Sequence, residues 1–109
     1  MSEITLKEMC AFTGLSRRTI QGYEKFGLVA PVNRNKYGHL IYDEKCQERI
    51  EKIRFCQELK FSLKEIQTII DAPNNVLKNA LIKHIVLLKK EDQHLKEIII
   101  QAEKIVKTL

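Results

Sequence analysis

The sequence predicts a mainly α fold in which a winged helix-turn-helix domain is followed by one long helix. Near the N-terminus, two short helical stretches are joined by a tight turn at Gly14, as in a helix-turn-helix. Residues 29–42 contain Pro, Asn, Gly and a short apolar run, which predicts a small hairpin or wing. The stretch 76–109 contains no Gly or Pro, which favours an unbroken helix. We therefore expect a first domain at 1–75 and a long helix at 76–109.

The first two helices have clear start and stop signals. Thr5 is followed three residues later by Glu8, which is the pattern of a capping box, and Gly14 ends the first helix. Ser16 is the candidate N-cap of a second helix, which ends where Gly27 supplies a C-cap.

Two further helices complete the first domain. Asp43 can cap the third helix, whose apolar residues fall mostly three apart and so form one inward face. Ser62 and Glu65 form a second capping box, at the start of the fourth helix. The stretch 72–75, Ala-Pro-Asn-Asn, then breaks the chain. Everything before this break can close one small core.

The long C-terminal stretch carries a heptad seam, which we take as the dimer interface. Its positions alternate steps of four and three without a slip: Leu81, Ile85, Leu88, Asp92, Leu95, Ile99, Ala102, Val106 and Leu109. One helix on so small a chain cannot bury this stripe against itself, so we expect a homodimer. Asp92 is the polar member of the seam. It is either hydrated at the edge of the helix pair or paired with a basic residue across the dimer, where it would fix the register.

The composition narrows the class of function. With 109 residues, the chain holds one compact domain and one appended element. It has 19 Lys and Arg against 14 Asp and Glu, a net charge of +5, which favours a polyanionic partner. No stretch approaches the roughly 18 apolar residues of a membrane span, and the N-terminus lacks the pattern of a signal peptide. We expect a cytoplasmic protein with no membrane partner.

Neither a metal site nor a catalytic site is expected. Cys10, Cys46 and Cys56 are odd in number and far apart, which suits free thiols, and no pair has a Cys-x-x-Cys spacing. Core packing explains them better than metal binding. His84 and His94 are ten residues apart on the predicted helix and do not form a close pair. We find no Ser-His-Asp, paired-carboxylate or phosphate-loop pattern, so we expect no enzyme and no cofactor.

Separated segments of the chain match one known pattern in order. Residues 13–20, Thr-Gly-Leu-Ser-Arg-Arg-Thr-Ile, continue with Tyr23-Glu24 and Gly27-Leu28-Val29. The later matches are Pro31, Arg34, Gly38, Tyr42, Leu59, Phe61-Ser62-Leu63 and Glu65-Ile66. Over roughly residues 4–70 the chain thus resembles the winged helix-turn-helix of the MerR (mercury-resistance regulator) family. Its last helix resembles that family's antiparallel coiled-coil dimerisation helix, and the whole resembles a short form without an evident C-terminal effector domain.

The resemblance implies a dimeric transcription regulator that binds a pseudo-palindromic site in double-stranded promoter DNA. Family members bend and untwist an overlong promoter spacer so that RNA polymerase, the implied protein partner, engages both promoter elements. Gln21 stands where the family usually has a basic residue and Gly22 where it has an aromatic one, which implies a different DNA sequence. Lys60 replaces a usual Gly and adds a positive charge near the expected DNA.

The second helix carries the candidate reading face. Arg18, Gln21, Gly22 and Lys25 fall at i, i+3, i+4 and i+7, and so share one polar face opposite Ile20. Arg can contact guanine or phosphate, Gln can form paired hydrogen bonds with adenine, and Gly permits close approach. An ordinary solvated helix face would have a similar composition, but the preceding turn and the resemblance favour DNA. The predicted DNA contacts are Arg17, Arg18, Thr19, Gln21, Gly22, Tyr23, Lys25, Arg34, Lys36, Tyr37, His39, Tyr42, Lys60 and Lys64.

Some of these contacts have a second interpretation. Tyr23 is either a core ring or a phosphate contact, and an amphipathic Tyr often serves as both. Tyr42 fits the core as well as it fits phosphate, and His39 fits an ordinary turn.

For the protein as a whole, the alternative function is a helical adaptor that binds another protein through its C-terminal coiled-coil helix. A third interpretation is an architectural protein that bends DNA without needing a paired site.

Overall fold

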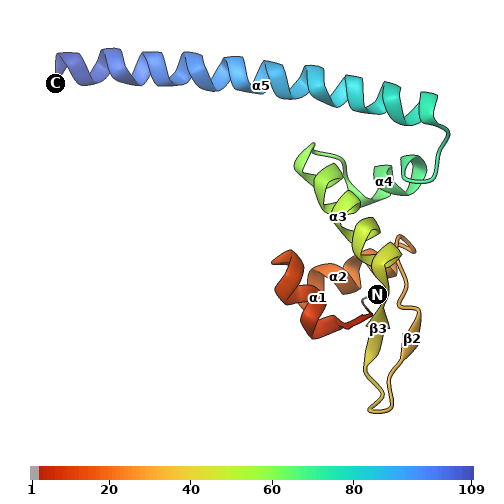
Figure 1. The fold of residues 1–109 in the computed structure, drawn as a ribbon. Helices are drawn as coiled ribbons and strands as arrows, with labels where there is room; N and C mark the ends of the chain where they lie inside the picture. The colour runs from red at the N-terminus through yellow and green to blue at the C-terminus, as the bar shows by residue number, and fades with distance from the viewer. Residues whose placement is uncertain (1–2) are drawn as a thin grey trace. The chain divides into compact units, whose positions relative to one another are not determined.

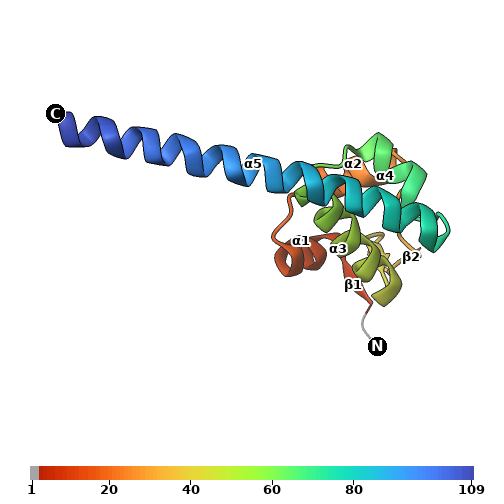
Figure 2. The same ribbon diagram turned by 90° about the horizontal axis from the view of Figure 1, so that it is seen from above.

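The computed structural model describes residues 3–109, which form two compact units. One unit ends at Ala72 and the other is Pro73–Leu109. The first contains four helices and three short strands, and the second is a single helix, so the fold is mainly helical as predicted. Figures 1 and 2 show the course of the chain in two views.

The first two helices form the predicted helix-turn-helix. α1 (Leu6–Thr13) begins with the predicted capping box: Glu8 N–H donates to Thr5 Oγ1 at 3.2 Å, and Thr5 N–H donates to Glu8 Oε1 at 2.9 Å. It ends at Gly14, whose φ of +75° belongs to the left-handed region that glycine adopts freely. α2 (Arg17–Lys25) begins at Ser16, as predicted.

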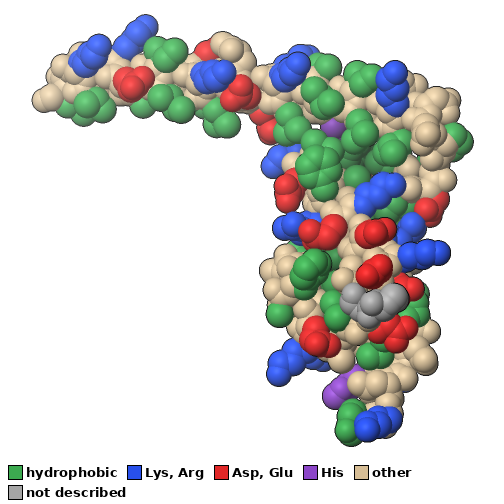
Figure 3. Space-filling view, in the orientation of Figure 1, with side chains coloured by type: hydrophobic (Ala, Val, Ile, Leu, Met, Phe, Trp, Pro, Cys, Tyr) green, Lys and Arg blue, Asp and Glu red, His purple; other side chains and the backbone are tan. Residues whose placement is uncertain are grey.

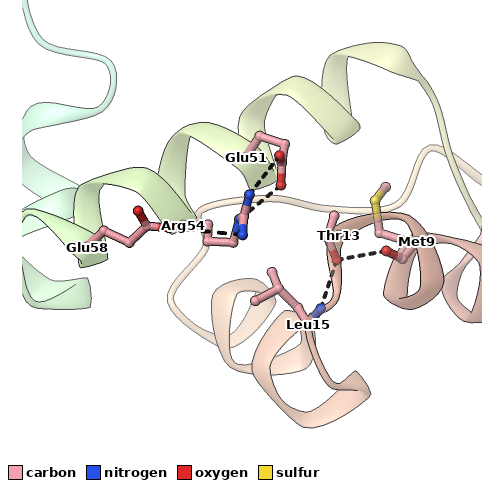
Figure 4. A network of polar contacts seen from close by, with 6 residues as sticks. All are labelled: Met9, Thr13, Leu15, Glu51, Arg54 and Glu58. Carbon is pink, nitrogen blue, oxygen red and sulfur yellow. Dashed lines mark hydrogen bonds and ion pairs between the residues drawn. The ribbon is translucent and has the colours of Figure 1, made fainter.

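A buried threonine fixes the turn between these helices. Thr13 Oγ1 donates to Met9 O at 2.8 Å and accepts from Leu15 N–H at 3.2 Å, so one hydroxyl joins the end of α1 to the turn (Figure 4). A buried hydroxyl with both bonds made avoids the cost of an unsatisfied polar group. The turn between α1 and α2 is therefore stabilised by the Thr13 hydroxyl as well as by the glycine.

A three-stranded antiparallel sheet joins the N-terminus to the wing. β2 (Asn33–Arg34) and β3 (Leu40–Tyr42) form the predicted hairpin. The sequence did not predict β1 (Ile4–Thr5), which pairs with the other edge of β3 and gives the order β1-β3-β2. A two-residue strand carries no detectable alternation of apolar and polar residues, which is why the pattern missed it. The pairing brings the start of α1 next to the wing.

The last two helices of this unit also begin at the predicted caps. α3 (Glu44–Glu58) starts after Asp43, and α4 (Leu63–Ile69) starts with the Ser62 and Glu65 capping box. The largest fully buried side chains come from all parts of the unit and form one core: Met9, Ile20, Tyr23, Tyr42, Ile50, Ile53 and Ile66. Burying a side chain of this size contributes about 1.5–3 kcal/mol.

Two side chains tie the end of α2 to the C-terminal part of this unit. Arg49 of α3 donates to Leu28 O and forms two hydrogen bonds of 2.8 Å with the carboxylate of Asp71. The hydrogen bonds from the Arg49 guanidinium lower the pKa of the Asp71 carboxyl. Gln67 of α4 donates to Phe26 O. The segment that follows α2 is thus bonded to both α3 and α4.

The second unit is the predicted long helix. α5 (Asn74–Thr108) begins two residues before the predicted start, and its 35 residues correspond to about 52 Å. Hydrophobic side chains lie along it in the space-filling view (Figure 3). Asp92 forms an ion pair of 3.2 Å with Lys96 on the same helix. No helix of residues 3–109 is both long enough and apolar enough to cross a membrane.

α2 ends in a Schellman motif with glycine at the left-handed position. Gly27 N–H donates to Glu24 O at 2.9 Å and Leu28 N–H donates to Tyr23 O at 3.0 Å. Gly27 has φ of +70°, which costs glycine little because it has no Cβ.

α3 ends in the same motif, but with lysine at that position. Lys60 N–H donates to Gln57 O at 2.9 Å and Phe61 N–H donates to Cys56 O at 3.1 Å. Lys60 has φ of +75° and is the one non-glycine residue among residues 3–109 with a positive φ. A residue with a Cβ loses roughly 1–2 kcal/mol in this conformation.

We expect Lys60→Gly to raise the free energy of unfolding by about 0.5–1 kcal/mol. The gain is the relieved strain, less the roughly 0.4–1 kcal/mol that the more flexible glycine costs through the unfolded chain. Urea unfolding followed by circular dichroism measures it.

Gly27→Lys is the reciprocal control. A Cβ at Gly27 would meet nothing within 4 Å, so this change adds backbone strain without a clash and should lower stability by a similar amount. A Lys60→Gly variant that is no more stable than the parent would show that the strain is absent.

Candidate nucleic-acid interface

α2 buries its apolar side and leaves its polar side open. Ile20 is fully buried, whereas Arg18, Gln21 and Lys25 are exposed, so the predicted reading face is a free surface of this unit. Gly22 lies between them, and a Cβ added there would meet nothing within 4 Å. Packing inside the protein therefore does not require glycine at this position. The small residue instead leaves room on the outer face of α2.

A basic cleft joins this face to the wing. It has a volume of about 370 Å³ and is lined by Thr5, Leu6, Lys7, Arg17, Gln21, Arg34, Gly38, His39 and Leu40. The structure thus brings together four of the predicted residues, Arg17, Gln21, Arg34 and His39, from α2 and the hairpin. Three of the lining residues are cationic and none is acidic, so the cleft favours an anion.

Sequence reasoning missed Lys7 as a member of this cleft. Lys7 lies in the first turn of α1, a helix that the sequence presents only as a scaffold. It reaches the cleft because β1 pairs with β3, with Ile4 opposite Tyr42 and Thr5 opposite Ile41. The available signal was the pair Ile4-Thr5, whose second residue also begins the capping box, and two residues are too few to identify a strand.

Lys36 and Tyr37, at the tip of the wing, do not line the cleft, and both are exposed. Asn35 Oδ1 accepts from Tyr37 N–H at 2.9 Å and from His39 N–H at 3.0 Å, which shapes the turn. The Lys36 ammonium lies 5.2 Å from the centre of the Tyr37 ring, within the range of a cation–π contact. Arg34 Nη1 donates to Gly38 O at 2.6 Å, so Arg34 also supports the hairpin.

Tyr23 and Tyr42 are core residues, and their assignment as DNA contacts is corrected. Both side chains are buried. Tyr23 Oη donates to Gln57 Oε1 at 2.7 Å, and Tyr42 Oη donates to the Glu24 carboxylate. Burial raises the pKa of both hydroxyl groups, and the hydrogen bond to Glu24 raises that of Tyr42 further. Both rings are buried, and each hydroxyl already donates to a protein partner. Neither tyrosine therefore offers a phosphate an exposed hydrogen-bond donor.

The remaining predicted contacts lie on the surface but do not line the cleft. Lys60 and Lys64 are exposed around the start of α4. Thr19 is half-buried, and its hydroxyl is hydrogen-bonded to Ser16 Oγ at 2.9 Å, which supports the N-cap of α2. Because of that bond, the Thr19 hydroxyl mainly stabilises the start of α2.

The cysteines are free thiols within the N-terminal unit. Cys46 and Cys56 are buried and Cys10 is half-buried. Cys46 Sγ donates to Ala30 O at 3.2 Å, and burial raises the pKa of the Cys46 and Cys56 thiols. Within residues 3–109, no group of three or more His, Cys, Asp or Glu side chains is arranged to hold a metal ion.

Comparison with known proteins points to one family. The model of the "MerR HTH family regulatory protein" matches residues 4–73. The HTH-type transcriptional activator mta of Bacillus subtilis is 32% identical over 94 residues, which are 86% of this chain and 37% of that protein. The chain spans about a third of the length of the curated relatives it matches.

Solved structures agree with this match. The N-terminal part of the same Bacillus subtilis activator, MtaN, superposes with a TM-score of 0.73 at 29% identity, covering 94% of this chain and 97% of that chain. HiNmlR, described as a MerR family regulator lacking the sensor domain and bound to promoter DNA, has a TM-score of 0.72 at 21% identity, covering 90% and 85%. The second likeness shows the fold alone.

The helix-turn-helix and the wing built on β3 lie within the matched residues 4–73, which make up more than half of the chain. The chain belongs to the MerR family of helix-turn-helix regulatory proteins.

Proposed function

We propose that this protein is a sequence-specific DNA-binding transcription regulator that binds a pseudo-palindromic promoter site as a homodimer and distorts it. The basic cleft carries this proposal, because Lys7, Arg17 and Arg34 surround it without an acidic neighbour among its lining residues. A duplex carries a phosphate on each nucleotide of both strands, and such a cleft can hold one or more of them.

The two kinds of contact come from different residues. Lys7, Arg17 and Arg34 position the protein by contacting phosphates, which carry no sequence information. Gln21, on the exposed face of α2, reads bases through its amide in the major groove, and Gly22 lets the α2 backbone come close to them. These assignments place α2 in the major groove with the wing and the start of α1 against the backbone.

Dimerisation and distortion rest on α5. Leu95 and Ile99, on the heptad seam, are more than half exposed in the single chain, at 58% and 57%. An antiparallel partner helix would cover them and set the distance between two α2 helices. If that distance differs from the half-site spacing of relaxed DNA, the duplex must bend or untwist, and phosphate contacts offset the cost. RNA polymerase would then engage the reshaped promoter.

Two similar proteins support this proposal. The Bacillus subtilis relative is described as a transcriptional activator, and HiNmlR was solved on promoter DNA. Both share with this chain the winged helix-turn-helix on which the proposal rests.

A pair of substitutions separates positioning from reading. The probe is a short duplex selected by the protein from a random pool. We expect Lys7→Ala to weaken binding equally on selected and unselected duplexes and to reduce the slope of log affinity against log salt by about 0.9. Gln21→Ala should cost about 1–3 kcal/mol at one or two base pairs and spare unselected duplexes. Fluorescence anisotropy at several salt concentrations measures both.

Lys104→Ala is the matched control, because Lys104 is an exposed lysine of α5 that lies far along the sequence from the cleft. It should leave the slope unchanged. Equal effects of Lys7→Ala and Lys104→Ala would mean that only net charge matters and that the cleft is not the phosphate site.

The dimer is tested by a charge on the seam. We expect Leu95→Glu to make the protein mostly monomeric in sedimentation, because antiparallel pairing brings the two copies of residue 95 together near the helix centre. Affinity for the selected duplex should fall towards the unselected level, because one half-site alone gives up the paired contacts.

Ile100→Glu is the control for this substitution. Ile100 is 52% exposed, an exposed fraction similar to that of Leu95. It follows the seam residue Ile99 directly and so lies about 100° away from Ile99 around the helix. It should leave the dimer intact. A Leu95→Glu protein that remains dimeric would exclude the seam as the dimer interface.

A further inference from the structure

A shallow groove on the N-terminal unit is lined by acidic side chains, whereas the basic cleft is lined by cationic ones. It lies between the end of α1 and the first part of α3, and is lined by Phe12, Glu44, Gln47, Glu48 and Glu51. It shares no lining residue with the cleft. Lys7 and Phe12 are five residues apart on α1, which places them on different sides of that helix. The two sites therefore open in different directions from α1.

The centre of the groove is an exposed aromatic ring. Phe12 is 67% exposed, although a phenylalanine of this unit could be buried, as Phe61 is at 5%. α1 does not use Phe12 for the core, because it buries Leu6, Met9 and Thr13 instead. Aromatic residues left on a surface are enriched at protein interfaces, where they act as anchors.

The rim of the groove is acidic, although the protein as a whole carries a net charge of +5. Glu44, Glu48 and Glu51 fall at i, i+4 and i+7 and so share one face of α3. Glu51 is bonded to Arg54 at 3.1 Å, and Arg54 also reaches Glu58 at 4.0 Å (Figure 4). Acidic side chains gather on the face of this unit that Figure 3 shows. This rim repels DNA, so the groove is not a second nucleic-acid site.

We infer that this groove docks a basic segment of a partner protein, in which an apolar side chain is flanked by Lys or Arg. The apolar side chain would pack on Phe12, and the flanking cations would meet carboxylates of the rim, among them that of Glu48. Charge complementarity selects this occupant. An acidic segment would be repelled by the carboxylates of the rim, and a purely apolar segment would remove water from them without supplying a positive charge. The inference does not rest on DNA binding, and the groove stays open when the basic cleft is occupied.

The test uses the full chain and a defined probe, the peptide Lys-Arg-Leu-Lys-Arg with blocked ends. We expect its titration, followed by two-dimensional NMR, to shift the amide signals of residues 10–13 and 44–51. A peptide with Ser in place of Leu should bind about tenfold more weakly, because it lacks the anchor. A peptide with Glu in place of each cation should not bind.

Matched variants show whether Phe12 is the anchor. Phe12→Ser should raise the Kd of the Leu peptide about tenfold. Phe55→Ser is the control, because Phe55 is 57% exposed on the same face of α3 but does not line the groove, and it should leave the Kd unchanged. Glu48→Gln should raise the Kd about two- to fivefold, with Glu103→Gln on α5 as its control.

Three results would overturn the inference. They are equal binding of the Leu and Ser peptides, equal effects of Phe12→Ser and Phe55→Ser, and signal changes outside the two named segments. Phe12→Ser should also keep the affinity of the parent for the selected duplex. That measurement confirms that the variant is folded and separates this inference from the proposed DNA-binding function.

Discussion

The basic cleft depends on the pairing of β3 on both of its edges. β3 pairs with β2 to make the wing and with β1 to hold the start of α1, so three separate parts of the chain meet along one three-residue strand. Packing holds β3 in place, because the side chains of Ile41 and Tyr42 are buried in the core. Without β1, Lys7 would have no fixed relation to Arg34, and the cleft would lose one wall. A few backbone hydrogen bonds therefore determine the geometry of the charged surface.

The other end of α2 is held by a second set of bonds. Arg49 and Gln67 bond to the carbonyls of Leu28 and Phe26, and the same Arg49 side chain holds Asp71 just before the chain enters α5. The segment that follows α2 and the segment that leads into α5 thus share one guanidinium, that of Arg49. This arrangement limits how far α2 can move without changing the segment that leads to α5.

Much of the fold could be predicted because its signals are local. The capping boxes at Thr5 and Ser62 mark helix starts, and the glycine after α2 marks its end, all within a few residues of sequence. The site was predicted less completely, because it depends on pairing between distant segments. Lys7 reaches the cleft only through a two-residue strand, and the core positions of Tyr23 and Tyr42 depend on partners 34 and 18 residues away. A pattern on one helix cannot reveal such contacts.

The outer face of α2 is separate from the core, and this has an evolutionary consequence. Gly22 has open space around it, and Gln21 is exposed, so neither is restrained by packing. The one acidic residue of α2, Glu24, is instead engaged with the buried Tyr42 hydroxyl. Under the proposed function, duplicated copies of such a gene could exchange the outward residues of α2, and with them the recognised DNA sequence, with little loss of stability. New regulatory circuits can then arise by drift on a surface that the fold leaves free.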